Sequence, residues 1–304
     1  MQSGLNKQIK DEPGLVSGLN ELASAYDVIL CDVWGVIHNG LAYFPAAADA
    51  LTRFRAKGGK VVLITNAPRP RQVVVEQLDG FGVPRSAYDG LVTSGDVTLS
   101  LIRESNLSRL IHIGAQRDRV LFDLLERDGR AIELAGVDDA EIAVCTGLFD
   151  ENLYDLADYE PLLAAMRARD LTFICANPDI VVHVGDELMY CAGALAERYE
   201  ALGGRVNQAG KPFSSIYAEA FTIAAALMKD KLERRRILAI GDAMHTDMKG
   251  AQNEKLDALF VTSGIHREEL QGMAQGNVLD AAAVRQFAEA IGFIPMAAIP
   301  ELVW

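Results

Sequence analysis

The segment Ile237–Asp247 combines an apolar run with two carboxylates at a spacing that suits cation binding. The run Ile237–Ile240 leads into Gly241 and Asp242, and Asp247 follows five residues later, where a helix is expected to begin. Two carboxylates at one edge of a sheet repel each other unless a cation or protons intervene, and Mg²⁺ usually takes one or two protein carboxylates. Asp247 could instead be an acidic residue that stabilises a helix N-terminus. The segment alone leaves both interpretations open.

Three other places put polar side chains at the edge of an expected element. Asp32 follows the apolar run Val28–Cys31, and Thr65 and Asn66 follow a second such run. Lys211 lies in a Gly-Lys-Pro loop before a helical stretch. A hydroxyl, an amide and an ammonium can all hold phosphate oxygens. Each residue taken alone is equally typical of a turn, a helix cap or a solvated surface charge.

Short apolar runs alternate with amphipathic stretches along the whole chain, as buried strands alternate with helices. The clearest expected strands are 28–31, 60–64 and 237–240, and the clearest expected helices are 46–57, 213–228 and 281–291. This alternation predicts an α/β fold with a doubly wound parallel sheet. Ligands bind at the carboxyl ends of the strands in such a sheet, which is where Asp32, Thr65 and Asp242 are expected.

A middle section repeats the same pattern and predicts a second α/β domain inserted into the first. Its expected strands are Leu110–Ile113, Glu141–Cys145 and Leu171–Cys175. Residues typical of hinges occur near 93–95 and 202–204. We therefore predict a core domain of residues 1–94 plus 204–304 and an inserted cap of residues 95–203.

Taken together and in order, the four polar sites resemble the motif set of the haloacid dehalogenase (HAD) superfamily. Three further segments resemble its class IIA branch, which includes NagD and p-nitrophenylphosphatases: Cys175–Asp179, Cys191–Ala194 and Gly210–Phe213. The resemblance extends from about Tyr26 to Ile291. It implies a Rossmann-like HAD core, a large α/β cap of the C2 type between the second and third motifs, and Mg²⁺-dependent hydrolysis of small phosphomonoesters.

The resemblance also implies a role for each matched residue. Asp32 would attack phosphorus and form an aspartyl-phosphate, which divides a difficult hydrolysis into two easier steps. Mg²⁺, the implied cofactor, would be held by Asp32, Asp242, the main-chain carbonyl of Trp34 and, directly or through water, Asp247. The oxygens of the transferring phosphoryl group would be held by Thr65, Asn66 and Lys211. Such positioning and charge neutralisation dominate phosphoryl-transfer catalysis.

The implied cap would close over the core, exclude water and contact a small phosphorylated metabolite as substrate. Asn177, Asp179 and His183 lie in the cap segment expected to face the site, although buried turn residues would show the same pattern. Caps of this type often meet at a dimer interface in the family. The resemblance therefore leaves a homodimer open, by analogy alone.

Trp34 departs from the family pattern. Phosphatases of the superfamily usually have a second aspartate two residues after the nucleophile, which protonates the leaving group and then activates water, and a tryptophan can do neither. Losing a positioned general acid–base costs about 10²–10⁴-fold. His38, in the same loop, is our candidate substitute. Two alternatives stay open: a phosphate-ligand-binding protein with weak or no turnover, and a metal-independent dehalogenase-like hydrolase, whose relatives also have an aromatic residue there.

The composition argues against several classes of partner. The 304 residues have a formal net charge of −13, which disfavours nucleic acid and anionic membranes. No apolar stretch approaches the ~20 residues that span a bilayer, and the first residues lack an apolar signal region. The four cysteines have neither disulfide nor zinc spacing, so we expect them to be reduced and buried. These observations together predict a cytoplasmic protein.

Overall fold

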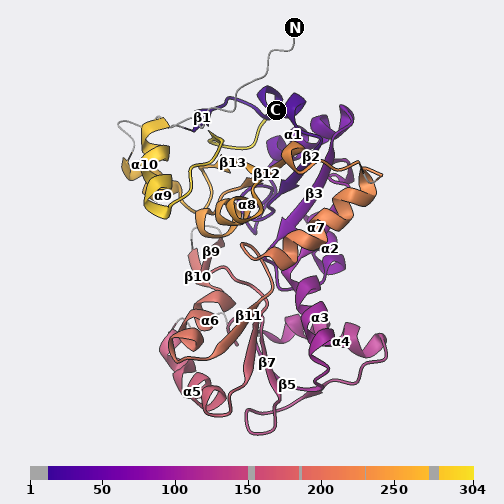
Figure 1. Ribbon diagram of the computed structural model, residues 1–304, viewed down its shortest axis with the longest axis vertical. Coiled ribbons are helices and arrows are strands. Elements are labelled where there is room, and N and C mark those ends of the chain that lie inside the picture. The colour runs from indigo at the N-terminus through magenta and orange to yellow at the C-terminus, as the bar shows by residue number, and fades with distance from the viewer. Residues whose placement is uncertain (1–12, 150–154, 185–186, 230, 274–280) are drawn as a thin grey trace.

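The computed structural model describes residues 13–149, 155–184, 187–229, 231–273 and 281–304, and it has two α/β lobes (Figure 1). The predicted core domain also includes residues 1–12, 230 and 274–280, and the predicted cap includes residues 150–154 and 185–186, all of which lie outside the described residues. Within the described ranges, no helix is both long enough and apolar enough to cross a membrane.

The larger lobe is built on a seven-stranded sheet in which every strand pair is parallel. Its order is β1-β14-β13-β12-β2-β3-β4. The strands are β1 (Gly14–Leu15), β2 (Val28–Cys31), β3 (Lys60–Thr65), β4 (Gly90–Thr93), β12 (Ile237–Gly241), β13 (Asp257–Val261) and β14 (Ala297–Ile299). In the central strand β2, Leu30 lies opposite Ala239 of β12 and Val62 of β3.

Helices cover both faces of this sheet. Ile29 and Cys31 of β2 pack in the cluster on one face, whereas Val28 and Leu30 pack in the cluster on the other. The first face is covered by α1 (Pro45–Ala56) and α2 (Arg71–Phe81), and the second by α7 (Ser214–Leu227), α8 (Lys249–Glu254), α9 (Arg267–Met273) and α10 (Ala281–Ile291). Strands buried on both faces need apolar residues at every position, which is why they form continuous apolar runs. The structure confirms the predicted doubly wound parallel α/β fold.

The smaller lobe has its own five-stranded parallel sheet, in the order β11-β8-β7-β5-β6. The strands are β5 (Arg109–Ile113), β6 (Glu133–Leu134), β7 (Ile142–Cys145), β8 (Thr172–Cys175) and β11 (Arg205–Gln208). One face is covered by α3 (Ser94–Ser105) and α4 (Val120–Arg127), and the other by α5 (Glu160–Ala168) and α6 (Ala192–Ala201). The inserted section therefore has hydrophobic clusters of its own.

The position of β11 changes the predicted end of the cap. This strand lies beyond residue 203 but belongs to the smaller sheet, where Val206 pairs with Phe173 of β8. The prediction stopped too early because Gly203 and Gly204 were interpreted as a hinge. They instead form the turn from α6 into β11, and Gly203 has φ +79°. We propose that the inserted domain extends from α3 to β11.

A β-hairpin lies between the two lobes (Figure 1). Its antiparallel strands are β9 (Val181–Val184) and β10 (Glu187–Tyr190). Loops after the carboxyl ends of β2, β3 and β12 in the larger lobe line one cavity together with loops after β5, β7 and β8 in the smaller lobe. Residues of the hairpin line the same cavity.

Candidate active site

The core sheet changes its winding direction between β2 and β12, because the chain continues to β3 and β4 on one side and later to β12 and β13 on the other. Such a switch point is where open α/β sheets bind ligands. Asp32 directly follows β2, and Asp242 directly follows β12. Asp32, Asp242 and Asp247 are buried, and each offers a carboxylate oxygen within 4.8 Å of the others. The structure thus brings together three of the residues predicted from sequence.

Asp247 reaches this cluster from a single turn of π-helix, Met244–Met248. Isolated π turns are frequent at functional sites because the wider turn redirects one side chain. The Oδ2 atom of Asp247 accepts a hydrogen bond from the main-chain N–H of Ala243, at 3.1 Å. The π turn continues directly into α8 (Lys249–Glu254), so Asp247 lies in the first turn of this helical segment and also contributes to the aspartate cluster.

Two glycine-containing loops enclose Asp242. Its Oδ2 accepts a hydrogen bond from the main-chain N–H of Ile265, at 2.8 Å. A Cβ atom on Gly264 would lie 1.9 Å from this oxygen, and one on Gly35, which has φ +84°, would lie 2.1 Å from it. Only glycine allows so close an approach. Gly264 and Ile265 were not among the residues predicted from sequence, although the Thr-Ser-Gly run after β13 has the same pattern of polar residues at the end of a strand.

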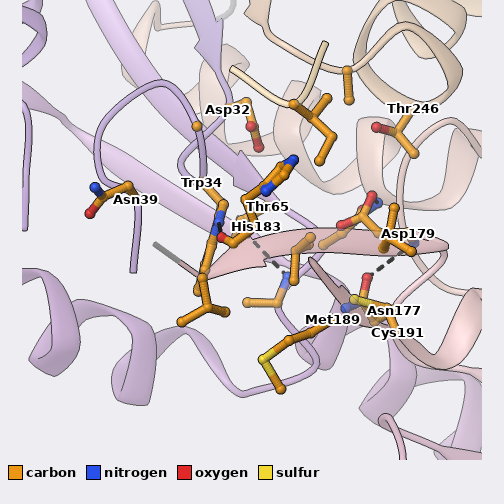
Figure 2. Close-up of a pocket in the computed structure, with 18 of the residues that line it drawn as sticks. Asp32, Trp34, Asn39, Thr65, Asn177, Asp179, His183, Met189, Cys191 and Thr246 are labelled. Atoms are coloured by element: carbon orange, nitrogen blue, oxygen red, sulfur yellow. Dashed lines mark hydrogen bonds between the residues drawn. The ribbon is translucent and has the colours of Figure 1, made fainter. Parts of the chain in front are cut away.

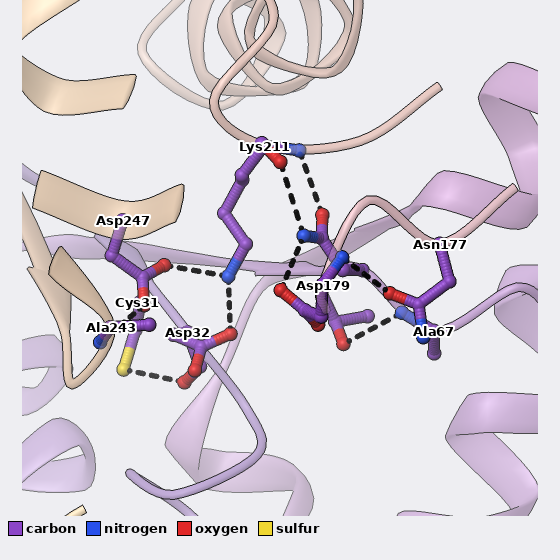
Figure 3. A network of polar contacts seen from close by, with 10 residues as sticks. Cys31, Asp32, Ala67, Asn177, Asp179, Lys211, Ala243 and Asp247 are labelled. Carbon is purple, nitrogen blue, oxygen red and sulfur yellow. Dashed lines mark hydrogen bonds and ion pairs between the residues drawn. The ribbon is translucent and has the colours of Figure 1, made fainter. Parts of the chain in front are cut away.

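Lys211 supplies the cation of the cluster (Figure 3). Its Nζ atom lies 2.5 Å from Oδ1 of Asp32 and 2.6 Å from Oδ1 of Asp247. Lys211 is only 2% exposed, so both ion pairs are shielded from solvent. The residue lies in the loop that returns from β11 of the cap to α7 of the core. The position of this cation therefore depends on both lobes.

Thr65 and Asn66 are also buried, at the end of β3. The Thr65 Oγ1 atom accepts a hydrogen bond from the main-chain N–H of Ala67, at 3.2 Å, which leaves the hydroxyl proton available in the cavity that Thr65 lines. The Asn66 side chain instead holds the main chain of Lys211. Its Oδ1 accepts from the Lys211 N–H at 2.7 Å, and its Nδ2 donates to the Lys211 carbonyl at 3.2 Å. Only the main chain of Asn66 is left for the predicted phosphate contact.

The three predicted cap residues line the same cavity (Figure 2). Asp179 Oδ1 accepts a hydrogen bond from Asn66 Nδ2 at 2.9 Å, and Asn177 Oδ1 accepts one from the main-chain N–H of Asp179 at 3.1 Å. Burial raises the pKa of Asp179 to about 6, although Lys211 opposes the shift. Asn177 and Asp179 therefore form a buried turn that also joins the cap to the core. His183 lies on β9 of the hairpin.

The Trp34 indole connects the loop after Asp32 to the cap hairpin. Its Nε1–H donates a hydrogen bond to the main-chain carbonyl of His183, at 2.8 Å. The ring lies so close to Gly40 that a Cβ atom there would be 2.7 Å from it. The position where family members have their acid–base aspartate is thus occupied here by a contact between core and cap.

The structure does not support His38 as the substitute for that aspartate. Its Nδ1 accepts a hydrogen bond from the main-chain N–H of Gly40 at 3.0 Å, and its ring lies 5.0 Å from the rings of Trp34 and Phe81. Burial lowers the pKa of His38 to about 4. A neutral imidazole of this kind is a weak base and is not a proton donor matched to neutral pH. His38 lines the cavity, and its ring packs against Trp34 and Phe81.

The charges of the cluster fit a divalent cation. Burial, followed by repulsion from Asp247, raises the pKa of Asp32 well above its usual range and that of Asp242 to about 7. Burial opposes the charged form of Lys211, but Asp247 and Asp32 raise its pKa well above the ordinary value. With all three carboxylates ionised, as a bound cation would require, the three aspartates beside one ammonium leave two negative charges for the cation to neutralise. Since the donors are all oxygens, these residues suit Mg²⁺.

The cavity that contains Asp32 has a volume of about 790 Å³. This is far more space than a phosphate needs and lies within the range of small-molecule sites. Its wall includes four polar residues that the sequence analysis did not name: Arg69, Arg117, Asp118 and Thr146. They come from loops that follow β3, β5 and β7, so only the packing of the two lobes brings them together.

Comparisons with known proteins identify the family to which the chain is similar. A family model of haloacid dehalogenase-like hydrolases matches residues 29–126, and a HAD-hydrolase-like model matches residues 208–285. The crystal structure of a haloacid dehalogenase-like hydrolase from Brucella suis 1330 is 44% identical, covers 95% of this chain and 100% of that chain, and has a TM-score of 0.82. The chain therefore belongs to the haloacid dehalogenase-like hydrolase family.

Curated relatives place the chain within that family. The ribonucleotide monophosphatase NagD of Escherichia coli K12 is 27% identical over 240 residues, which are 78% of this chain and 88% of NagD. The 4-nitrophenylphosphatase of Schizosaccharomyces pombe is 21% identical over 272 residues, which are 82% of this chain and 88% of the yeast enzyme. The predicted NagD-like class is confirmed.

Proposed function

We propose that this chain hydrolyses a small phosphomonoester in a Mg²⁺-dependent reaction, through an aspartyl-phosphate on Asp32. The observation that carries the proposal is the convergence of Asp32, Lys211, Asp242 and Asp247 at the switch point of the core sheet, inside one cavity. The names of the relatives, a nucleotide monophosphatase and a nitrophenylphosphatase, support the same class of reaction.

In the proposed first step, a carboxylate oxygen of Asp32 attacks phosphorus and the bond between phosphorus and the ester oxygen breaks. Lys211 and Thr65 hold the non-bridging oxygens during the transfer. The alcohol leaves with the electron pair of the broken bond and takes its proton from water, because Trp34 has none to give. In the second step, water attacks the phosphorus of the aspartyl-phosphate and the bond between phosphorus and the Asp32 oxygen breaks. The attacking water loses a proton to solvent, which balances the proton taken from water in the first step, and phosphate and the Asp32 carboxylate are released.

Asp32, Asp242 and Asp247, with the main-chain carbonyl of Trp34, are the groups that would hold the metal. When bound, Mg²⁺ neutralises charge on the phosphoryl oxygens and orients them for in-line attack. The same acidic cluster disfavours the dehalogenase-like alternative. An anionic carboxylate substrate would be repelled by three buried aspartates that no metal neutralises.

Metal removal tests the proposal. With p-nitrophenyl phosphate as substrate, EDTA is expected to reduce phosphate release by at least about 100-fold, because a metal ion supplies several kcal/mol of transition-state stabilisation. Excess Mg²⁺ should restore the rate. Calorimetric titration should show Mg²⁺ binding to the wild type and weaker binding to Asp242→Asn.

Turnover that EDTA leaves unchanged would contradict the metal requirement. Absence of turnover under every condition, with phosphate still binding, would instead favour the alternative of a phosphate-binding protein without turnover. This alternative is considered because Trp34 cannot act as a general acid or base.

Trp34 also predicts an unusual dependence on the leaving group. Without a general acid, the wild type should favour p-nitrophenyl phosphate, whose leaving group needs no proton, over glycerol 3-phosphate. Trp34→Asp is expected to raise the ratio of kcat for glycerol 3-phosphate to kcat for p-nitrophenyl phosphate by about 10–100-fold, part of what a general acid can supply.

The matched control is Trp34→Phe. Both variants lose the indole hydrogen bond to His183, and only one gains a carboxylate. Equal rate ratios in the two variants would show that this position has no influence on protonation of the leaving group.

A further inference from the structure

The cap sheet has a switch point of its own, between β5 and β7. From β5 the chain continues to β6 at one edge of the sheet and then crosses to β7, β8 and β11 on the other side. The rule that places Asp32 between β2 and β12 also places a ligand site at the carboxyl ends of β5 and β7. The loops after these two strands line the cavity that contains Asp32. The cap therefore presents its ligand-binding edge to the reacting centre.

These two loops contain a buried polar cluster. Asp118, in the loop after β5, is 4% exposed, and Thr146, directly after β7, is 3% exposed. The Thr146 Oγ1 lies 2.9 Å from Nε2 of His112, and the Thr146 side chain is close enough to Asp118 to lower the pKa of that carboxyl. A Cβ atom on Gly114 would lie 1.9 Å from the same Oγ1, so the chain is closely packed here. Buried polar groups are costly unless they are paired, and these form a connected set.

Two arginines, one from each lobe, face Asp118. Arg69 follows β3 in the core, and its Nε lies 3.3 Å from Oδ1 of Asp118. Arg117 precedes Asp118 in the cap and lines the same cavity. Burial raises the pKa of Asp118, and both arginines oppose that shift.

The guanidinium group of Arg69 has donors left over. Within the part of the chain that the structure describes, its two terminal nitrogens have no hydrogen-bond partner. Arg69 lines the cavity, and its side chain is 27% exposed. A planar guanidinium binds carboxylate and phosphate groups through paired hydrogen bonds. These donors are therefore suited to an anionic oxygen group in the cavity.

We propose that Arg69, which Asp118 holds in place, and Arg117 bind a second anionic group, a carboxylate or a phosphate, on the alcohol part of the substrate. This inference rests on the proposed function and narrows its substrate class to phosphorylated sugar acids or bisphosphates. The cavity volume of about 790 Å³ leaves room for a carbon chain between the phosphoryl group at Asp32 and the second anion.

Matched substrate pairs test the proposal and separate its two sources of charge. 6-Phosphogluconate has a carboxylate where the open-chain sorbitol 6-phosphate has a CH2OH group, and fructose 1,6-bisphosphate differs from fructose 6-phosphate by a phosphate. For the wild type, kcat/KM should be about 10–100-fold higher for the more anionic member of at least one pair, the size expected for hydrogen bonds to charged groups. Arg69→Gln and Arg117→Gln should each reduce that ratio by about 10-fold or more.

Arg71→Gln is the matched control. It removes the same charge two residues from Arg69, but Arg71 is paired with Asp96 and does not line the cavity. The substrate ratio should stay at its wild-type value in this variant. Thermal melting of each protein checks folding, and if Arg69→Gln does not fold, Arg117→Gln decides the result from the cap side.

Binding to Asp32→Asn distinguishes failure of this inference from failure of the proposed function. We would measure dissociation constants for the same substrate pairs by calorimetry. The proteins compared are Asp32→Asn alone and Asp32→Asn combined with Arg69→Gln or with Arg117→Gln. These constants do not depend on turnover. Absence of turnover in the wild type would contradict the proposed function. The binding comparison would then still decide whether the two arginines bind a second anionic group. The inference is overturned if neither anionic partner binds better, or if its preference survives both substitutions.

Discussion

Asp32→Asn is expected to reduce phosphate release by at least about 10⁴-fold, the scale of effect seen when a catalytic nucleophile is removed. An amide has nearly the same shape as a carboxylate but cannot attack phosphorus. The variant should fold, because Lys211 keeps its ion pair with Asp247 and one of three mutually repelling carboxylates is removed. The measurement is phosphate release from p-nitrophenyl phosphate with saturating Mg²⁺, combined with thermal melting.

Asp49→Asn is a suitable control for this prediction. It makes the same chemical change at an exposed residue of α1, whose partner is Arg53 and which does not line the cavity. Its rate should equal that of the wild type. Radioactive phosphate from a labelled substrate should be trapped on the wild type by acid quenching and not on Asp32→Asn. Residual activity of Asp32→Asn near the wild-type rate would exclude the aspartyl-phosphate mechanism.

Lys211→Met is expected to have the second-largest effect, a loss of about 10²–10³-fold in kcat, comparable to removing a preorganised donor from an oxyanion site. Methionine preserves most of the side-chain length but supplies no charge. Asp32 and Asp247 then lose the cation that lies within 2.6 Å of both. Breaking a buried ion pair by removing one partner typically costs about 3–5 kcal/mol. We therefore expect the metal-free variant to melt at a lower temperature.

Added Mg²⁺ should recover part of this stability, because a divalent cation can neutralise the remaining carboxylates. The measurement is thermal melting with EDTA and with increasing Mg²⁺, together with kcat. Lys249→Met serves as control, since Lys249 is exposed on α8 and its Nζ donates a hydrogen bond to Gln252. If Lys211→Met melted at the wild-type temperature in EDTA, the pairing of Lys211 with the aspartates would have no energetic weight.

The fold could be predicted from sequence because the residue types along each strand indicate which of its faces are buried. Val28–Cys31 and Ile237–Gly241 are apolar at nearly every position since both faces of the core sheet are covered by helices. The same apolar runs show where these strands end, and Asp32 and Asp242 are the first residues after them. In a parallel sheet all carboxyl ends lie at one edge, so their proximity followed without knowledge of the tertiary contacts.

Predictions failed where a local pattern fits two structures. Gly203 and Gly204 suggested a hinge, but glycine with positive φ serves a hinge and a tight turn equally well, and here the turn leads into β11. His38 looked like an available loop histidine. Its burial against Trp34 and Phe81 depends on how the loop folds back on the core, which the sequence pattern does not record.

The sequence by itself determined the α/β class, the order of the strands along the chain and the residue types at the reacting centre, because these depend on local burial and on chemistry that few side chains can perform. Only the tertiary structure decided what lies around that centre. Three contacts around it join segments that are distant in sequence: the hydrogen bond from Trp34 to His183, the hydrogen bonds between Asn66 and Lys211, and the ion pair of Arg69 with Asp118. Such contacts depend on how the two lobes pack, and neither partner carries a local signal for the other.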